Sequence, residues 1–165
     1  MASGKTRVWQ RIYANDGSFR EFFVGEFVWH EGHNHWHFEK FALYQLWSLT
    51  STGALDTLVA TSSKVTYCIA DNTHVDPSLP SSPNQAVYTI CGQELQGLSV
   101  GWGDAYRSYL QGQSLDITSV VNGVYALKSK ADPSNLLREL NDDNNAAVIC
   151  IRINGNRVRV VSCNP

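Results

Sequence analysis

The chain has 165 residues, 43% of them hydrophobic, which is enough to bury a core of its own, so we expect one domain over residues 1–165. A formal net charge of -2 and a pI near 6.2 argue against nucleic acid or an anionic membrane as its partner. No apolar run approaches the roughly 20 residues of a spanning helix, so no membrane span is expected.

Short segments rich in β-branched and aromatic residues follow one another along the chain, and most of them alternate polar and apolar positions. The predicted strands cover residues 6–13, 20–28, 41–49, 64–70, 123–128, 146–153 and 156–161. Turn signals lie between them at 15–18, 51–53, 122–123 and 154–155. Only residues 133–141 have the composition of a helical turn. We expect an all-β fold, an antiparallel sandwich-like domain with long loops and little helix.

The chain has four cysteines and no C-x-x-C pair, which favours two disulfides over a thiolate metal site. They are Cys68, Cys91, Cys150 and Cys163. Four cysteines allow three pairings, and four buried free thiols in a cytosolic protein are the alternative. Two disulfides would indicate an extracellular protein, although the start "MASGKTRVWQ" lacks the apolar segment of a signal peptide.

The stretch "WHEGHNHWHF", residues 29–38, contains four of the five histidines. If the segment is extended, His33, His35 and His37 lie on one face, because strand side chains alternate, and His30 has the opposite parity. Imidazole is the usual protein ligand of copper and zinc, and three imidazoles leave coordination positions open for a substrate. Surface histidines are the alternative interpretation, but the spacing of two between aromatic residues favours a transition-metal site.

The histidine segment has to bend if three imidazoles are to share a metal. His33 and His37 would be roughly 13 Å apart on a flat strand at about 3.3 Å per residue. Gly32 and Asn34 lie beside the first ligand and tolerate the backbone conformations that a bend needs.

The reaction remains open at this point. A zinc hydrolase would need a base such as Glu39, and a cupin-like oxygenase would need a further downstream histidine, for which only His74 is available. The chain has no P-loop and no dinucleotide fingerprint. The residues alone therefore indicate a metal without fixing its chemistry.

Three separated segments carry a resemblance to the lysyl oxidase family. "GEFVWHEGHNHWHFEKFALYQL" resembles the family's copper-binding segment, in which the last three of four clustered histidines hold copper. "VATSSKVTYCIAD" resembles the segment with the lysine precursor of the family's cofactor, and "CGQELQGLSVGWGDAYRSYLQGQSLDIT" the segment with the tyrosine precursor. The resemblance covers roughly Arg11 to Cys163 and is closer to the bacterial and archaeal branch.

The resemblance implies a copper amine oxidase, with His33, His35 and His37 as copper ligands. Its cofactor would be lysyl tyrosylquinone, formed within the protein from Lys64 and Tyr106. The implied reaction oxidises primary amines, peptidyl lysine above all, to aldehydes with O2 and releases hydrogen peroxide and ammonia.

The base that removes the substrate proton is not assigned by the resemblance. Glu39, Asp71 and Asp104 are the carboxylates near the motifs, and each of them could instead be a solvated or turn residue. A different metalloenzyme, such as a cupin-like oxygenase, and a non-catalytic copper-binding or matrix-binding module are the alternative functions.

The resemblance also implies the disulfide pairs Cys68–Cys91 and Cys150–Cys163 and a secreted protein. A two-residue turn at 154–155 conflicts with the second pair, because it would place Cys150 opposite Arg159. Either a longer turn or a chain end that curls back would remove the conflict.

Two features depart from the family pattern. The family's β segment before the part that matches residues 6–13 has no counterpart, so we expect an unpaired sheet edge or a strand from another copy, and the oligomeric state stays open. The run of residues 139–145 resembles a calcium site in which Glu139, Asn144 and Asn145 would be weak ligands. Asn141 stands where an acid is usual, and a solvated loop is the alternative.

Overall fold

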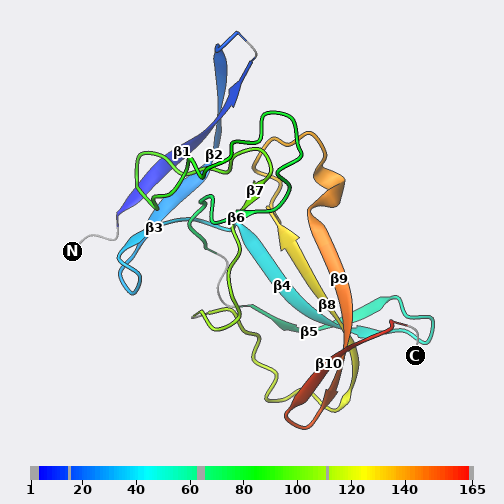
Figure 1. The fold of residues 1–165 in the computed structure, drawn as a ribbon. Coiled ribbons are helices and arrows are strands. Elements are labelled where there is room, and N and C mark those ends of the chain that lie inside the picture. The colour runs from blue at the N-terminus through cyan, green and yellow to red at the C-terminus, as the bar shows by residue number, and fades with distance from the viewer. Residues whose placement is uncertain (1–3, 15, 63–65, 111, 164–165) are drawn as a thin grey trace. The chain divides into compact units, whose positions relative to one another are not determined.

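The computed structural model describes residues 4–14, 16–62, 66–110 and 112–163. Within these ranges the regular structure consists of antiparallel strands and one short 3-10 helix (Figure 1). The expected all-β antiparallel fold with little helix is therefore confirmed. None of the helical structure in the described ranges is long and apolar enough to cross a membrane.

The chain forms two compact units. The first comprises Met1–Lys40, Thr66–Arg107 and Leu136–Arg138, and the second comprises Phe41–Val65, Ser108–Asn135 and Glu139–Pro165. The single domain expected over residues 1–165 stays a prediction.

The first unit contains a three-stranded sheet in the order β1-β2-β3 and a small two-stranded sheet (Figure 1). The strands are β1 (Lys5–Tyr13), β2 (Phe19–His30), β3 (His35–Phe38), β6 (Thr73–His74) and β7 (Trp102–Gly103). The turn between β1 and β2 contains Gly17 at φ 82°, a left-handed conformation that glycine adopts without strain. Among the described strands β1 pairs with β2 alone, so it lies at an edge of this sheet.

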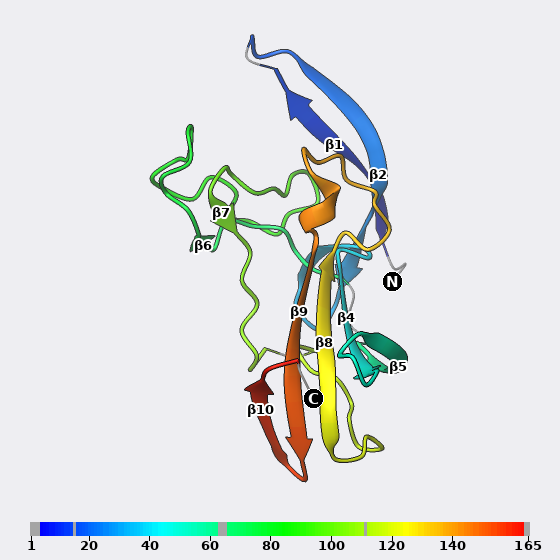
Figure 2. The same cartoon turned by 90° about the vertical axis from the view of Figure 1, so that its right-hand side faces the viewer.

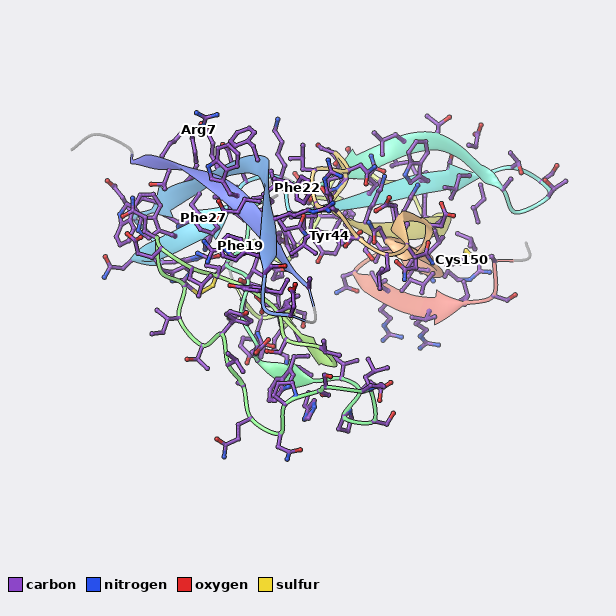
Figure 3. The ribbon with its side chains drawn as sticks, turned by 90° about the horizontal axis from the view of Figure 1, so that it is seen from above. Arg7, Phe19, Phe22, Phe27, Tyr44 and Cys150 are labelled. Carbon is purple, nitrogen blue, oxygen red and sulfur yellow. A yellow bond between two sulfur atoms is a disulfide. The ribbon has the colours of Figure 1, made fainter. Side chains whose placement is uncertain are left out.

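Aromatic rings and guanidinium groups line one exposed face of the β1–β2 hairpin. The Trp9 and Phe23 rings meet edge to face with centroids 5.6 Å apart, and Arg7 lies 4.8 Å from the Phe23 centroid. Figure 3 shows Arg7 and Phe19 on this hairpin. Such cation-π contacts contribute about 0.5–1 kcal/mol each at exposed positions.

The core of the first unit lies where β2 meets β3. Val24, Phe27 and Phe38 are buried, and the Phe27 and Phe38 rings meet edge to face at 6.1 Å. The clustered histidines lie at the end of β2, in the turn that follows it and in β3, so this packing fixes the position of the cluster.

The second unit is a five-stranded antiparallel sheet in the order β10-β9-β8-β4-β5. Its strands are β4 (Ala42–Leu49), β5 (Leu55–Thr61), β8 (Gly123–Ala131), β9 (Ala146–Asn154) and β10 (Arg157–Val161). Figure 2 shows β8 and β9 side by side. Leu46, Tyr125, Ile151 and Ile153 form its buried cluster.

Three sequence-based assignments need correction. The segment predicted as a strand over 64–70 makes only an isolated bridge at Tyr67 in its described part, residues 66–70. The helical turn predicted at 133–141 is absent there, and the 3-10 helix η1 covers Asp142–Asn144 instead. Asp132 and Asn135, at φ 38° and 50°, interrupt a right-handed helix at that point. β5 was missed because its residues are exposed at nearly every position, which removes the alternating pattern.

The structure joins Cys68 to Cys91 and Cys150 to Cys163, the pairs that the resemblance implies. The hairpin between β9 and β10 has Asn154 opposite Arg157, so its loop is residues 155–156. This register places Cys150 opposite Val161, only two residues before Cys163. The conflict over the second pair came from placing the turn one residue too early.

Candidate metal centre

The histidine segment folds into a hairpin rather than a bent strand. His30 ends β2 and lies opposite His35, which begins β3, and residues 31–34 form the turn. The Asn34 amide donates to the His30 carbonyl oxygen at 2.8 Å, and Asn34 has φ 57°. The bend expected from Gly32 and Asn34 is therefore a chain reversal, with Asn34 in the left-handed conformation.

The hairpin brings four imidazoles together. The centroid of the His33 ring lies 5.5 Å from that of His35 and 5.4 Å from that of His37. The ring centroids of His35 and His37 are 4.8 Å apart. His30 stacks on His33 at 4.3 Å and on His37 at 4.9 Å. The three sequence-predicted ligands and the fourth histidine therefore share one cluster.

The spacing of the nitrogen atoms fits a metal ion. His35 Nε2 and His37 Nε2 are 2.8 Å apart. Two nitrogens bound at about 2.0 Å and at a right angle would be separated by about 2.8 Å, so these atoms have the spacing of neighbouring ligands. One nitrogen from each of His30, His33 and His37 also lies within 4.8 Å of the others. Clustered neutral imidazoles suit copper or zinc.

His30 belongs to this cluster, although the parity of an extended strand separated it from the other histidines. The parity argument failed because the chain reverses at residues 31–34, which brings the end of β2 beside β3. The His30 Nδ1 atom is buried and has no hydrogen-bond partner among the described atoms. His30 is thus a further nitrogen donor near the three predicted ligands.

His37 is held from the side opposite the cluster. Its side chain is fully buried, and its Nδ1 atom lies 3.3 Å from Thr66 Oγ1. A proton on Nδ1, donated to Thr66, places the lone pair of the ring on Nε2, the nitrogen that could bind a metal, and fixes the ring plane. Sequence analysis missed Thr66, although a hydroxyl residue next to the apolar run 67–70 is the kind of signal that could have identified it.

Replacing Thr66 with valine should weaken metal binding without unfolding the protein. Valine keeps the shape of threonine but leaves His37 Nδ1 without its partner, and loss of such a partner typically reduces metal affinity about 10–100-fold. Competitive copper titration measures the change. Thr61→Val is the matched control, because the Thr61 hydroxyl contacts the Tyr44 carbonyl oxygen in the second unit. Equal affinities for the two variants would remove the role of Thr66.

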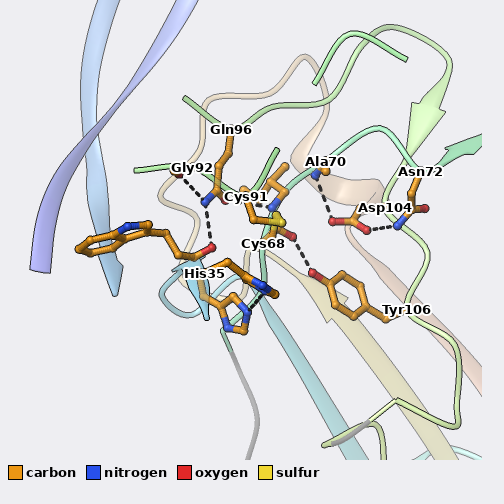
Figure 4. The surroundings of a disulfide bond; sticks show 12 residues. His35, Cys68, Ala70, Asn72, Cys91, Gly92, Gln96, Asp104 and Tyr106 are labelled. Carbon is orange, nitrogen blue, oxygen red and sulfur yellow. Dashed lines mark hydrogen bonds between the residues drawn. A yellow bond between two sulfur atoms is a disulfide. The ribbon is translucent and has the colours of Figure 1, made fainter. Parts of the chain in front are cut away.

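β3 is fixed by hydrogen bonds to two loop segments. Phe38 and Tyr67 exchange backbone hydrogen bonds at 2.7 and 3.2 Å. The Trp36 amide donates to the Cys91 carbonyl oxygen at 3.2 Å, and the Gln96 side chain donates to the Trp36 carbonyl oxygen at 2.9 Å. The Cys68–Cys91 disulfide joins these two segments (Figure 4). The sequence carries no pattern that singles out Gln96.

Tyr106 lies in the surroundings of the same disulfide (Figure 4). Its hydroxyl donates to the Cys68 carbonyl oxygen at 2.9 Å, and its ring meets the Tyr67 ring edge to face at 4.8 Å. Residues 66–68 therefore contact His37, Phe38 and Tyr106 in turn. Lys64, the other predicted cofactor precursor, lies outside the described residues.

The three carboxylates near the motifs have different surroundings. Glu39 forms an ion pair with Lys5 at 3.2 Å. Asp71 is 5% exposed and accepts hydrogen bonds from the Val87 and Tyr88 amides and from the amide and hydroxyl of Ser99. Burial raises the pKa of Asp71, but these hydrogen bonds outweigh it and hold the pKa below its ordinary value. Asp71 is thus an ionised structural group.

Replacing Asp71 with alanine should destabilise the first unit. The change leaves several buried donors without an acceptor, each of which costs about 1–3 kcal/mol. We expect a loss of about 3 kcal/mol or more in the free energy of unfolding, measured by urea denaturation at pH 7. Because the folded-state pKa is depressed, the contribution of Asp71 is present above pH 3.8 and is lost as the pH falls further. If Asp71→Ala had the same free energy of unfolding as the wild-type protein, the segments that contain Val87 and Ser99 would not need this carboxylate.

Asp104 differs from the other two carboxylates. Its oxygens accept hydrogen bonds from the Ala70 amide, at 3.1 Å, and from the Asn72 side chain. Burial raises the pKa of Asp104 to about 6, although both hydrogen bonds act to lower it. The protonation of Asp104 can therefore change near neutral pH.

The residues of the suggested calcium site lie in the second unit. The Asn145 side chain donates a hydrogen bond to a carboxylate oxygen of Glu139, and the Asn141 side chain accepts one from the Asp143 amide. Asn144 ends η1. Of the three suggested ligands, Glu139 and Asn145 are thus hydrogen-bonded to each other, and calcium binding stays a prediction.

Comparison with known proteins gives a family match. The family model described as lysyl oxidase matches residues 13–163. "Lysyl oxidase homolog 2A" of Danio rerio is 32% identical over 137 residues, which is 82% of this chain and 17% of that protein. "Protein-lysine 6-oxidase" of Gallus gallus is 31% identical over 138 residues, 82% of this chain and 30% of that protein. The chain therefore spans less than a third of the length of these relatives.

Proposed function

The chain belongs to the lysyl oxidase family, and on this premise we propose that it is a copper-dependent oxidase of primary amines, with peptidyl lysine as its substrate class. The observation that carries the proposal is the junction at residues 66–68. This short segment contacts the buried His37, pairs with β3 and accepts the hydrogen bond of Tyr106. A candidate metal ligand and a candidate redox tyrosine are thereby fixed to the same piece of backbone.

His33, His35 and His37 would hold copper. Their donors are neutral imidazole nitrogens, which suit copper, and the 2.8 Å between the Nε2 atoms of His35 and His37 suits adjacent positions on one ion. In the metal-free protein these two nitrogens share a hydrogen bond, so one ring carries the proton. Binding copper at both Nε2 atoms would require that proton to lie on the Nδ1 atom of its ring. Because a protonated imidazolium has no lone pair for a metal, copper affinity should rise with pH.

Lys64 and Tyr106 would form lysyl tyrosylquinone, which supplies the electron sink for amine oxidation. Overall, R–CH2–NH2, O2 and H2O give R–CHO, NH3 and H2O2, so the amine carbon loses two electrons and O2 gains them. The chain's own contribution is to place the Tyr106 ring. The Cys68 carbonyl oxygen accepts a hydrogen bond from the Tyr106 hydroxyl, and the Tyr67 and Tyr106 rings meet edge to face.

We further propose that the protein acts outside the cell on lysine side chains of other proteins, with calcium at most a weakly bound accessory ion. Two disulfides support an oxidising compartment, because such bonds rarely persist in the cytosol. The net charge of -2 is compatible with a cationic lysine substrate.

Amine-dependent release of hydrogen peroxide tests this function. The protein is loaded with copper in air and incubated with a lysine-containing peptide, and peroxide and peptide aldehyde are both quantified. We expect the two products in equal amounts. The same peptide with its lysine acetylated is the control, because an acetylated amine cannot be oxidised in this way.

The assay also separates the alternative functions. A non-catalytic copper-binding module would bind copper and give neither product. A cupin-like oxygenase would be active with iron and would not couple peroxide to the free amine. Either result would contradict the proposed function.

A further inference from the structure

Two chain segments are connected by hydrogen bonds beside Tyr106. The Asn72 amide donates to the Gly103 carbonyl oxygen at 3.2 Å, and the Ala105 amide donates to the Asn72 side-chain oxygen at 2.7 Å. Between these contacts, the Asp104 carboxylate accepts from the Ala70 amide and the Asn72 side-chain amide (Figure 4). Asp104 thus provides two of the contacts that fix the backbone leading into Tyr106.

Both contacts depend on the charge state of Asp104. An ionised carboxylate offers two acceptor oxygens and makes the stronger hydrogen bonds, whereas a protonated carboxyl turns one oxygen into a donor. The Ala70 amide and the Asn72 amide are both donors, so neither could receive that proton. Protonation therefore removes or weakens at least one of the two contacts.

The charged groups on the same segments are engaged elsewhere. Asp71 is bound by Ser99 and by the Val87 and Tyr88 amides. His74 stacks on Trp102 with centroids 4.3 Å apart, and its Nε2 lies 2.9 Å from the Ser82 hydroxyl. Arg107 is exposed. Among the described residues, the pKa of Asp104 is thus determined by its burial and by the hydrogen bonds from the Ala70 amide and the Asn72 side chain.

Stability alone does not explain an ionised carboxylate in this place. Burial raises the pKa of Asp104 above its ordinary 3.8, so the folded protein favours the neutral form. Ionisation at neutral pH therefore costs folding free energy, and the cost appears as the pH rises from about 4 to about 6. A carboxylate that is kept at such a cost is characteristic of a functional site.

We propose that Asp104 is the positioning residue of Tyr106: its ionised carboxylate ties the Gly103–Tyr106 backbone to the Ala70–Asn72 segment, and protonation loosens the tyrosine. The link to catalysis rests on the proposed function, since it concerns the tyrosine that would become the cofactor. The structural link does not rest on it.

The first test follows NMR signals of the metal-free protein between pH 4.5 and 8. The Ala70 amide and the Tyr106 ring should both shift with a common midpoint near pH 6 and should lose that transition in Asp104→Asn. The matched control is Asp76→Asn, which removes a carboxylate that accepts hydrogen bonds from the Ser78 amide and hydroxyl, and it should keep the transition. An Ala70 amide or a Tyr106 ring that shows no transition in the wild-type protein would overturn the proposal.

The second test measures quinone formation in air at several pH values, with bound copper quantified in each sample. In the wild-type protein the rate per bound copper should fall below pH 6. In Asp104→Asn it should be low at every pH, by about tenfold or more at pH 7.5, because a small displacement of a reacting group is enough for such a loss. Copper affinity should stay unchanged.

These results separate the two proposals. If the wild-type protein forms no quinone, the proposed function fails, and the NMR transitions still decide the role of Asp104. If Asp104→Asn forms quinone with the wild-type rate and pH profile, the positioning role is wrong and the amine oxidase function stands. If Asp104 had only a structural role, Asp104→Asn would lower the stability of the protein but would leave the pH midpoint of quinone formation unchanged.

Discussion

His35→Ala should lose copper binding and, with it, quinone formation. The variant removes one of two Nε2 atoms that lie 2.8 Å apart, so only two of the three proposed ligands, His33 and His37, remain. Loss of an outer hydrogen bond already costs about 10–100-fold in metal affinity, so loss of a ligand should exceed about 100-fold. Bound copper per protein, after dialysis against a weak chelator, measures the effect.

The control is His74→Ala, which removes the histidine outside the cluster. His74 stacks on Trp102 and contacts Ser82, so its loss should affect local packing but not copper binding. His30→Ala is informative as well, because His30 lies within the cluster but outside the proposed ligand set. Full copper loading in His35→Ala together with loss in His30→Ala would replace His35 by His30 as a ligand.

Tyr106→Phe should abolish amine oxidation while copper binding stays intact. Phenylalanine keeps the ring and its contact with Tyr67 but has no oxygen from which a quinone could form. The lost hydrogen bond to the Cys68 carbonyl should cost about 1 kcal/mol of stability, too little to unfold the protein. Visible absorbance of the quinone and peroxide release should both disappear.

Tyr109→Phe is the matched control, because Tyr109 lies three residues further along and its side chain is 83% exposed. It should retain both signals. Quinone absorbance in Tyr106→Phe would mean that another tyrosine is oxidised, and loss of copper from this variant would mean that the tyrosine and the metal site are not separable.

The strands with strong patterning were predictable from the sequence. Alternating residues and turn signals located β1, β2, β4, β8, β9 and β10 to within a few residues. The short β6 and β7 were not predictable, because two residues per strand, paired across a long loop, leave no periodic pattern. The Ser99 amide and hydroxyl donate hydrogen bonds to the Asp71 carboxylate and hold that loop, and such contacts have no signature in a single sequence.

The candidate site was predictable in composition but only in part in geometry. The spacing of His33, His35 and His37 indicated a metal, whereas the inclusion of His30 depended on a chain reversal that parity arguments ignore. Tyr106 emerged only through the family resemblance, because nothing in its local sequence sets it apart from the other tyrosines. The distinct surroundings of Asp71 and Asp104 arise from segments far away in the chain, which the sequence alone does not bring together.

The central claim is that this chain makes its own quinone from Lys64 and Tyr106. The most direct measurement is a proteolytic peptide map by mass spectrometry, made after incubation of the protein with copper in air. We predict a covalently linked pair of peptides that contain Lys64 and Tyr106, absent when copper or O2 is withheld and absent in Tyr106→Phe. Separate, unmodified peptides from fully copper-loaded, aerated protein would contradict the account.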